Sequence, residues 1–430
     1  MERYNEYKDS GVYFIPDIPN SWQVLKAKYL FKQEKREVRP EDEIVTCFRD
    51  GQVTLRKNRR TEGFTNSMKE IGYQGVRKGD LVIHNMDAFA GAIGVSDSDG
   101  KGTPVYACCT PKRNDINQYY YCYLLRYLAR NGFILSLAKG IRERSTDFRF
   151  NDFKELYLPV PSKEEQDAIV SYIDLQSTKI DEAIAQQQKM IDLLNERKQI
   201  IINNAVTKGL NPDAPMKDSG VDWIGEIPEH WEVMKLKHVT SKIGSGSTPR
   251  GGAEVYQDSG IMFLRSQNVY NDGLKLDDVA HIVDGVHQKM KGTQVKYNDI
   301  LYNITGGSIG RCCCYDREDE ANVNQHVSIV RPKGIIAKYL MYNLQSDNAQ
   351  RQLRETLKGG NREGLAAVTF KEFLILTCPK EEQNQIVSHI ERMFVNIDRA
   401  ISNATKQISL LQERKQIIIN DVVTGKVKVS

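Results

Sequence analysis

The sequence predicts an α+β protein that contains two copies of one plan: two α/β-mixed domains separated by two long antiparallel coiled-coil helices, related as a pseudo-twofold internal repeat. Three observations predict this class. The phrase ERKQIIIN occurs twice, at 196–203 and at 413–420. Two long stretches, 162–207 and 380–424, contain neither Gly nor Pro. Between them, short β-branched segments alternate with Gly-rich turns, a pattern typical of mixed α and β structure.

The frames at the two ends of each copy match closely. KDSGVYFIPDIPNSWQVLKAKYL returns as KDSGVDWIGEIPEHWEVMKLKHV, and FKELYLPVPSKEEQ returns as FKEFLILTCPKEEQ. Such self-similarity indicates one structural plan used twice, and a chain of 430 residues has room for about two to four domains. We expect four segments along the chain: a first domain at 1–160, a helix at 161–208, a second domain at 209–377 and a helix at 378–425.

The middle of each copy retains only a skeleton. GDLVIHN at 79–85 followed by GAIG at 91–94 parallels NDILYN at 298–303 followed by GSIG at 307–310. A repeat kept only for packing would have less reason to vary mainly in the middle. The pattern therefore predicts one architecture with two different ligands.

Each stretch without Gly and Pro is predicted to be a helix with one apolar side. Ile and Leu recur at heptad-like spacing, which gives each helix a continuous seam. Ser162 and the acidic pair Glu164 and Glu165 suit a helix start, and Gly209 and Gly425 follow the two ends. The seam residues, which we expect at helix or subunit interfaces, are Ile169, Ile173, Ile180, Ile184, Ile191, Leu194 and Ile201 in the first copy, and Ile386, Ile390, Ile397, Ile401, Ile408, Leu411 and Ile418 in the second.

These helices need partners, because burying each Ile or Leu contributes about 1.5–3 kcal/mol that an isolated helix cannot gain. The helix of the other copy is the nearest partner, and an antiparallel pair would hold the two domains apart. An intermolecular coiled coil is the alternative, since heptads alone fix neither partner nor orientation. The three consecutive isoleucines of ERKQIII occupy most of a helix circumference, so we expect a domain base or another subunit to cover them as well.

Basic and amide residues gather in the expected loops of both domains. Arg can bind guanine with two hydrogen bonds, Asn and Gln can bind adenine in the same way, and Lys, Ser and Thr suit phosphate. A solvated basic loop is the alternative explanation for each cluster taken singly. The candidate DNA-binding residues are Arg49, Arg56, Lys57, Asn58, Arg59, Arg60, His84, Asn85, Arg142, Arg144, Ser145 and Arg149 in the first domain, and Ser245, Ser247, Thr248, Arg250, Arg265, Ser266, Gln267, Asn268, Asn303, Thr305, Lys358, Asn361 and Arg362 in the second.

The sequence shows no catalytic motif, so we expect no catalytic residues, no metal site and no cofactor in this chain. GSGSTPRGG at 244–252 lacks the Lys of a nucleotide-binding loop, and no GxGxxG follows an expected strand. The eight cysteines lack zinc-binding spacing, and neighbours in CCCY at 312–315 point to opposite faces of a strand. We interpret them as apolar strand residues in a reducing compartment, with a metal or redox site as the alternative.

Net charge and hydropathy bear on the partners and the cellular location that the sequence predicts. The net charge of +4 is too mild to argue for or against nucleic acid. The chain opens with MERYNEYKDSG, which has no apolar run, and no later stretch approaches the roughly 20 continuous apolar residues of a membrane helix. We expect a cytoplasmic protein without membrane contact.

Several motifs together resemble the specificity subunit of Type I restriction-modification systems, and the resemblance covers the whole chain. They are the IPxxW segments at 18–22 and 227–231, the helix starts PSKEEQ and PKEEQ that end in Gln166 and Gln383, and the two ERKQIII helix ends. GSGSTPRGG followed by GIMFLRSQNV at 260–269 is similar to the target-recognition domains of that family.

The resemblance implies a non-catalytic chain whose two target-recognition domains each read one half of a split double-stranded DNA target. It also implies two modification subunits that transfer methyl groups from S-adenosylmethionine to adenine, with two translocating restriction subunits as an optional addition. The family does not supply base-contacting residues by alignment. Two other functions stay open from the residues: a coiled-coil scaffold with two protein-binding modules, and a specificity partner of another type of restriction enzyme.

Overall fold

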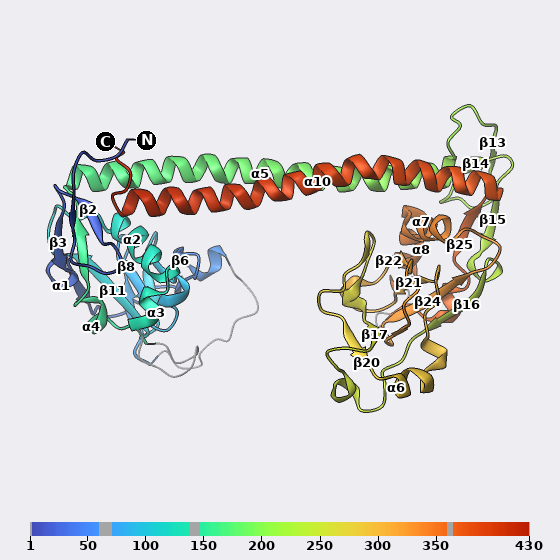
Figure 1. Ribbon diagram of the computed structural model, residues 1–430, viewed down its shortest axis with the longest axis horizontal. Helices are drawn as coiled ribbons and strands as arrows, with labels where there is room; N and C mark the ends of the chain where they lie inside the picture. Colours follow the sequence, from blue (N-terminus) through green and yellow to red (C-terminus); the bar gives the residue numbers. More distant parts are fainter. Residues whose placement is uncertain (1, 60–70, 138–146, 359–363, 430) are drawn as a thin grey trace. The chain divides into compact units, whose positions relative to one another are not determined.

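The computed structural model describes residues 2–59, 71–137, 147–358 and 364–429 (Figure 1). Contacts divide the chain into two compact units. Unit 1 comprises Met1–Gln187 and Lys406–Ser430, and unit 2 comprises Gln188–Thr405. Each unit therefore contains the beginning of one long helix and the end of the other.

Unit 1 is built on a four-stranded antiparallel sheet whose strand order is β4-β11-β8-β9. Helix α2 packs against β8 and β9, and the smaller sheets pair β1 with β2, β3 with β12, β5 with β6 and β7 with β10. The strands are β1 (Tyr7–Asp9), β2 (Asp17–Pro19), β3 (Gln23–Lys26), β4 (Phe31–Glu34), β5 (Val45–Cys47), β6 (Val53–Leu55), β7 (Gln74–Val76), β8 (Leu81–His84), β9 (Ile93–Val95), β10 (Gly100–Gly102), β11 (Tyr106–Pro111) and β12 (Tyr157–Val160). The helices are α1 (Ala27–Leu30), α2 (Gln118–Arg130), α3 (Phe133–Leu137), α4 (Phe150–Phe153) and the long α5 (Lys163–Lys208).

Unit 2 repeats this plan with the sheet β16-β24-β21-β22 and adds a second sheet, β20-β17-β23, in which β17 and β23 are parallel. The strands are β13 (Met216–Asp218), β14 (Glu226–Pro228), β15 (Glu232–Lys235), β16 (Thr240–Ser245), β17 (Ile261–Leu264), β18 (Val269–Tyr270), β19 (Gly273–Leu274), β20 (Ala280–Ile282), β21 (Ile300–Asn303), β22 (Cys312–Cys314), β23 (Ala321–Val323), β24 (Val327–Pro332) and β25 (Leu374–Thr377). The helices are α6 (Asp284–Lys289), α7 (Ala337–Gln345), α8 (Asp347–Lys358), α9 (Ala367–Phe370) and the long α10 (Lys380–Val423). The predicted α+β class and the internal repeat are confirmed.

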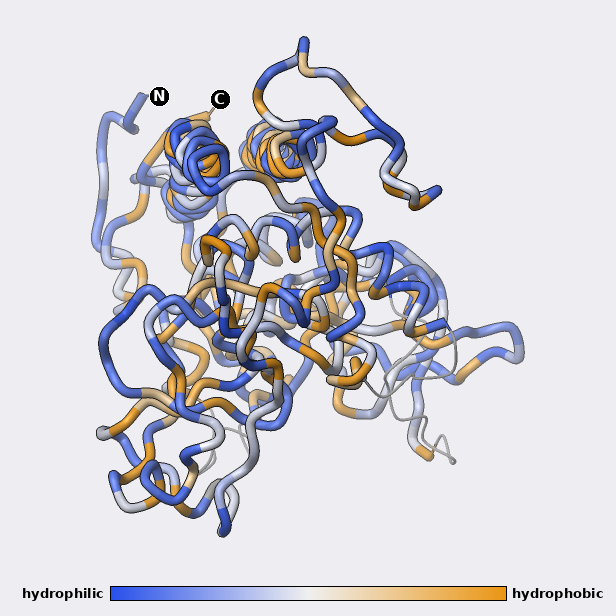
Figure 2. Tube along the Cα trace, turned by 90° about the vertical axis from the view of Figure 1, so that its right-hand side faces the viewer, coloured by the Kyte–Doolittle hydropathy of each residue, from blue (hydrophilic) through white to orange (hydrophobic). Residues whose placement is uncertain are grey.

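The two long helices pack against each other within each unit, with opposite chain directions. In unit 1, Lys415 of α10 forms an ion pair with Asp181 of α5 at 2.7 Å. In unit 2, Lys198 of α5 forms an ion pair with Asp398 of α10 at 2.6 Å. These lysines and aspartates occupy equivalent positions in the repeat, so both units use the same antiparallel register. Figure 2, which views the two long helices nearly end-on, shows that both contain hydrophobic and hydrophilic residues.

The seam residues are most buried where each helix meets a unit core. Ile169, Ile173 and Ile180 join the unit 1 core together with Ile418, and Ile386 and Ile390 join the unit 2 core. Ile397 is buried as well. The remaining seam positions are half-buried: Ile184, Ile191, Leu194, Ile201, Ile401, Ile408 and Leu411.

The repeated IPxxW segment supports the end of a long helix in each unit. Trp22 and Trp231 are fully buried. The glycine that follows each helix lies on the indole with positive φ, 76° at Gly425 and 73° at Gly209. A Cβ at Gly425 would stand 3.0 Å from Trp22, and one at Gly209 would stand 3.4 Å from Trp231. Glycine therefore allows both the left-handed turn and the close approach at each helix end.

The GD and ND pairs of the skeleton are structural. Gly79 has φ of 90°, and Asn298 is the one non-glycine among the described residues with positive φ, at 67°. The following aspartates, Asp80 and Asp299, are 2% and 1% exposed. Each accepts a backbone N–H from three residues earlier and forms an ion pair with an arginine of another segment: Arg77 N and Arg36 for Asp80, and Lys296 N and Arg331 for Asp299. These buried pairs fix the turn into β8 and β21.

The pairing of GAIG with GSIG that the sequence suggests is wrong by three residues. The structure matches Gly91 with Gly310, at φ of 92° and 91°. His84 N donates to Ala92 O at 3.0 Å, and Asn303 N donates to Arg311 O at 2.8 Å, which fixes the equivalence. The position that both copies retain is the left-handed glycine before the last strand of the sheet.

The glutamine that ends each KEEQ helix start, Gln166 or Gln383, joins a long helix to its unit. Gln166 is fully buried: its Oε1 accepts the Asn117 N–H at the start of α2 at 2.8 Å, and its Nε2 donates to Asp115 O and Pro161 O. Gln383 repeats this arrangement at the start of α7, where Ile336 N donates to its Oε1 at 2.9 Å and its Nε2 donates to Cys378 O. These bonds give hydrogen-bond partners to backbone groups where each long helix meets its unit.

We predict that Gln166→Leu lowers the free energy of unfolding by about 2–4 kcal/mol, because it leaves buried backbone groups without partners. Gln383→Leu is expected to have a similar cost. Urea denaturation followed by circular dichroism measures both. Gln186→Leu, at an exposed position of α5, is the matched control. Unchanged stability of the Gln166 variant would show that the motif does not join helix and unit.

Candidate nucleic-acid interface

In both units, variable loops meet at one end of the central strands of the four-stranded sheet. Asn85, directly after β8, donates its N–H to Val105 O at 2.8 Å, and Ile304, directly after β21, donates to His326 O at 3.0 Å. The carbonyls of the same two residues accept the N–H groups of Phe148 and Leu365. Three segments therefore meet at an equivalent place in each unit: the end of one strand, the approach to the next, and the chain that precedes α4 or α9. We call this place the reading edge.

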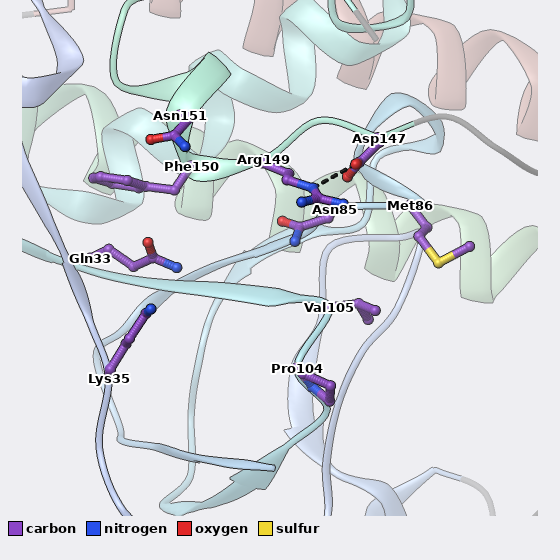
Figure 3. Close-up of a pocket in the computed structure, with 10 residues that line it drawn as sticks. All are labelled: Gln33, Lys35, Asn85, Met86, Pro104, Val105, Asp147, Arg149, Phe150 and Asn151. Atoms are coloured by element: carbon purple, nitrogen blue, oxygen red, sulfur yellow. Dashed lines mark hydrogen bonds and ion pairs between the residues drawn. The ribbon is translucent and has the colours of Figure 1, made fainter. Parts of the chain in front are cut away.

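In unit 1 the reading edge contains an open cavity of about 670 Å³ (Figure 3). Its polar lining combines amide and cationic side chains, which are the groups that bind base edges and phosphates. Arg149 is exposed, and its Nε donates to Asp147 at 2.5 Å. Asn85 Oδ1 is buried without a hydrogen-bond partner among the described residues. The lining residues are Gln33, Lys35, Asn85, Met86, Pro104, Val105, Asp147, Arg149, Phe150 and Asn151.

In unit 2 the reading edge carries a chain of hydrogen-bonded side chains from three loops. Thr248 bonds Gln325, Gln325 Nε2 lies 3.1 Å from His326 Nε2, and His326 Nδ1 lies 2.6 Å from Thr305 Oγ1. Thr248 and Gln325 are exposed. The network holds an exposed amide in a defined position, which base recognition requires.

The first glycine of the SGSTPRGG loop is required by space. A Cβ at Gly246 would stand 2.0 Å from Val323 O. Ser247 N donates to the same carbonyl at 3.3 Å, so this loop crosses directly over the end of β23. Ser245, Ser247 and Arg250 remain exposed beside it. The glycine thus brings predicted phosphate-binding residues onto the reading edge.

The predicted cluster after β5 in unit 1 is tied to acids of the same region. Arg49 pairs with Asp87 at 2.8 Å, close to His84 and Asn85, so it borders the reading edge. Arg59 pairs with Asp50 and lies 4.3 Å from the ring centre of Phe48, and Lys57 pairs with Glu43. Asn58 donates to Thr54 Oγ1, and Arg56 donates to Thr46 Oγ1.

His84 is part of the turn that follows β8. Its Nδ1 accepts the Asp87 N–H at 3.2 Å. Burial lowers the pKa of His84, which favours the neutral ring against the opposing effect of Asp87. The residue therefore shapes the turn beside Asn85 rather than supplying a positive charge there.

Two predicted residues of unit 2 are buried. Asn268 is 1% exposed, accepts Arg265 N and donates to Lys275 O. Asn303 is fully buried and donates to Ser266 O and Ser308 Oγ. Both amides serve the local fold, so base contact by either would require this region to open.

The remaining predicted residues are divided between surface loops and segments outside the described residues. Arg265 and Gln267 both donate to Asp278, and Lys358 pairs with Glu355 at the end of α8. The predicted residues that lie outside the described part of the chain are Arg60, Arg142, Arg144, Ser145, Asn361 and Arg362.

Sequence reasoning missed Gln33, Lys35, Asn151 and Gln325. Gln325 lies in NVNQHV, a polar run between two strands that an amide count would have found. Gln33 and Asn151 belong to a short strand and a short helix with no unusual composition. Only the folded sheet brings them to the same cavity.

No group of His, Cys, Asp or Glu that could hold a metal ion occurs among the described residues. The cysteines are free, and all but Cys378 are buried. Cys312 and Cys314 face one core cluster and Cys313 faces another, as expected for neighbours on a strand. Burial raises the pKa of the Cys313 thiol to about 12, which keeps it protonated and unreactive. None of the described helices has the length and apolar character of a membrane-spanning segment.

The long helices expose apolar residues at equivalent positions of the repeat. Leu193 and Ile200 of α5 are 55% and 50% exposed, and Leu410 and Ile417 of α10 are 53% and 50% exposed. We call these four residues the helix stripe. In ERKQIII the first isoleucine is exposed and the third is buried in both copies. Within each unit, the expected cover by the domain is therefore found for the third isoleucine and not for the first.

Comparison with known proteins shows which family this chain resembles. Residues 228–409 match the family described as the Type I restriction modification DNA specificity domain. This chain is similar to specificity subunits of Type I restriction-modification systems.

Individual relatives extend this match along the chain. The MjaVIII specificity subunit of Methanocaldococcus jannaschii is 26% identical over 74% of this chain and 72% of its own length. The MjaX specificity subunit of the same organism is 24% identical over 96% of each chain. A chain from a solved structure of the type I R-M system has a TM-score of 0.70 at 15% identity, covering 95% of this chain and 99% of that one.

We predict that Gln325→Ala weakens binding of the chain's target duplex by about 1–3 kcal/mol, the usual loss when a base-reading amide is removed. The melting temperature should not change, because Gln325 is exposed. Asn268→Ala is the matched comparison, and it should lower stability through lost buried hydrogen bonds. Duplex titrations and thermal unfolding of both variants measure the two effects. Full binding by the Gln325 variant would remove this residue from the interface.

Proposed function

We propose that this chain reads a bipartite duplex, with the reading edge of each unit bound to one half-site. The observation that carries the proposal is that the two reading edges have the same backbone construction and different side chains. Unit 1 presents Asn85 and Arg149, and unit 2 presents Thr248, Gln325 and Thr305. The same scaffold can therefore hold two duplex segments of different sequence.

The long helices act in this proposal as the spacer between the half-sites. Two readers of modest affinity gain from linkage only when the duplex presents both half-sites at the separation that the linker sets. A helix keeps a fixed rise of about 1.5 Å per residue, so α5 and α10 are suited to set that separation. In this geometry, neither reading edge contacts the base pairs that lie between the two half-sites.

We propose two modification subunits as the partners that cover the helix stripe. Leu193 and Ile200 lie in unit 2 and Leu410 and Ile417 lie in unit 1, so the chain offers the same apolar surface twice. A duplicated surface fits two copies of one partner. Each partner would bring S-adenosylmethionine and transfer its methyl group to an adenine. Restriction subunits would join this assembly through the same partners.

The remaining predicted residues complete the proposal. Arg49, Ser245, Ser247 and Arg250 are exposed beside the reading edges and are assigned to phosphate or base contact. Gln33, Lys35 and Asn151 of the unit 1 cavity are added to them. Buried Asn268 and Asn303 are assigned to the support of the unit 2 loops.

Coexpression with a methyltransferase subunit from the same genomic neighbourhood, followed by genome-wide mapping of methylated adenines, tests the function. The expected result is a bipartite motif with a fixed spacer. Substitutions at Asn85 and Arg149 should relax one half of the motif, and substitutions at Gln325 and Thr305 should relax the other. A continuous motif, or no methylation with a folded complex, would contradict the proposal.

We predict that deletion of one heptad from the middle of α5 changes spacer choice or prevents assembly while each half-site preference stays the same. Seven residues correspond to about 10 Å of helix, or about three base pairs. The methylation map of the variant measures spacer and half-sites separately. A change in half-site bases would contradict the spacer role.

We predict that Leu193→Ser with Ile200→Ser lowers affinity for the modification subunit at least tenfold, because exposed apolar anchors dominate such interfaces. Stability should change little, since both side chains are half exposed. Leu175→Ser is the control, because this exposed leucine is replaced by Arg392 in the other copy. Calorimetric titration with the purified partner gives both affinities. Equal binding by all variants would exclude the helix stripe as the docking surface.

A further inference from the structure

Both units carry the same five charged side chains on a surface that the reading edge does not include. In each unit two lysines pair with one glutamate, and the backbones of these segments bond to those of two further lysines or their neighbours. The residues are Lys26, Lys28, Lys112, Lys154 and Glu155 in unit 1, and Lys235, Lys237, Lys333, Lys371 and Glu372 in unit 2. We call each set the lysine patch. Every member is identical between the copies, although the loops of the same domains have diverged.

The backbone places these residues equivalently. Lys28 N donates to Lys154 O at 2.9 Å, and Lys237 N donates to Lys371 O at 3.1 Å. Lys112 N donates to Leu30 O, and Lys333 N donates to Val239 O, both at 2.8 Å. The patch therefore has one construction in both units, across the β3–β12 and β15–β25 pairs.

The glutamate holds two of the lysines at a fixed spacing. Glu155 lies 2.8 Å from Lys26 and 3.3 Å from Lys28, and Glu372 lies 2.7 Å from both Lys235 and Lys237. Hydrogen bonds from these lysines lower the pKa of Glu372 to about 2, so it stays ionised at neutral pH. One carboxylate cannot neutralise four ammonium groups, and the patch keeps a positive surplus.

The apolar neighbours of the patch are not retained. Exposed Tyr29 and Tyr157 border it in unit 1, where Lys26 lies 5.1 Å from the ring centre of Tyr157. The equivalent residues in unit 2 are His238 and Leu374. Protein interfaces depend on buried aromatic or aliphatic anchors, whereas phosphate contacts require charge alone. Retained charge with changed apolar residues favours a polyanion over a protein partner.

One lysine of the unit 1 patch contacts a residue that lines the unit 1 cavity. Lys154 Nζ donates to Asn151 Oδ1 at 2.9 Å, and Asn151 lines the cavity that contains Asn85 and Arg149. A duplex bound at that cavity would extend its backbone past the patch. Lysine is suited to this contact, because its compact charge binds phosphate without demanding a particular base.

We propose that each lysine patch binds the phosphate backbone of duplex DNA beside the half-site read by its own unit. This inference rests on the proposed function and adds a contact to it that is independent of sequence. Bases differ between half-sites, so base-reading residues differ between units. Phosphates are the same at both half-sites, so residues that contact them can stay identical.

The test uses the full chain with its methyltransferase partner and a duplex of random sequence about 40 base pairs long. Lys28→Gln with Lys154→Gln should reduce the slope of log affinity against log salt by about 2, and adding Lys237→Gln with Lys371→Gln should reduce it by about 4. The corresponding Lys→Arg variants should keep the wild-type slope. Lys179→Gln with Lys189→Gln, at exposed positions of α5, is the control and should also keep it.

Three further outcomes are distinguishable. An unchanged slope with lost methyltransferase binding would overturn the inference and assign the patch to a protein partner. An unchanged slope with normal assembly would overturn it outright. The methylation map of the patch variants should retain a bipartite motif; if the wild type itself gives no such motif, the proposed function fails whatever the slope. Thermal unfolding of each variant verifies that the fold is intact.

Discussion

Burial of the long-helix seam is the constraint on which both units depend. A helix of 46 residues with one apolar side, such as α5, gains little from its own hydrogen bonds in water. Its first turns complete the unit 1 core through Ile169 and Ile173, and its last turns complete the unit 2 core through Ile202 and Val206. Helix α10 contributes to the same two cores in the reverse order. Unit 1 is therefore built from two separate segments of the chain and unit 2 from one, and each requires both helices to bury its core.

This constraint explains which motifs occur twice. The buried glutamine at each helix start, the tryptophan under each helix end and the antiparallel ion pairs all lie where a long helix meets a unit. A substitution of one of these residues would weaken only the junction in its own unit. Each junction therefore needs its own copy of these residues. The Asp80 and Asp299 turns serve the sheet in the same way, because they fix where β8 and β21 begin.

The sequence was sufficient for features that follow from periodicity or repetition. Heptad spacing and the absence of Gly and Pro predicted helices at 161–208 and 378–425, and the structure has Lys163–Lys208 and Lys380–Val423. The repeat predicted a common architecture, and the two four-stranded sheets have the same strand order. These features depend on residue type at regular intervals, which a sequence displays directly.

The reading edge was only partly predictable, because residue type does not reveal burial. Asn268 and Gln325 are both amides in loops, yet one supports its own turn and the other is exposed. Gln33 and Asn151 meet in one cavity only because β4 and α4 approach the same edge of the sheet. The alignment of GAIG with GSIG was wrong because it rested on a match of only a few residues. The left-handed glycine is the only position in that turn that the backbone constrains in both described copies.

Duplication with divergence distinguishes two kinds of surface residue in this protein: those retained in both copies and those that differ between them. Stability does not explain the identical lysine patches, because exposed ion pairs are screened by solvent and contribute little. Stability does not explain the helix stripe either, because a Leu or Ile side chain that stays exposed to water adds no hydrophobic stabilisation. Residues retained in both copies without a structural role are best understood as contacts with something that is the same on both sides, such as a phosphate backbone or two copies of one subunit. In the proposed function, places that differ between the units, such as Asn85 and its equivalent Ile304, would correspond to what differs between the half-sites, which is the base sequence.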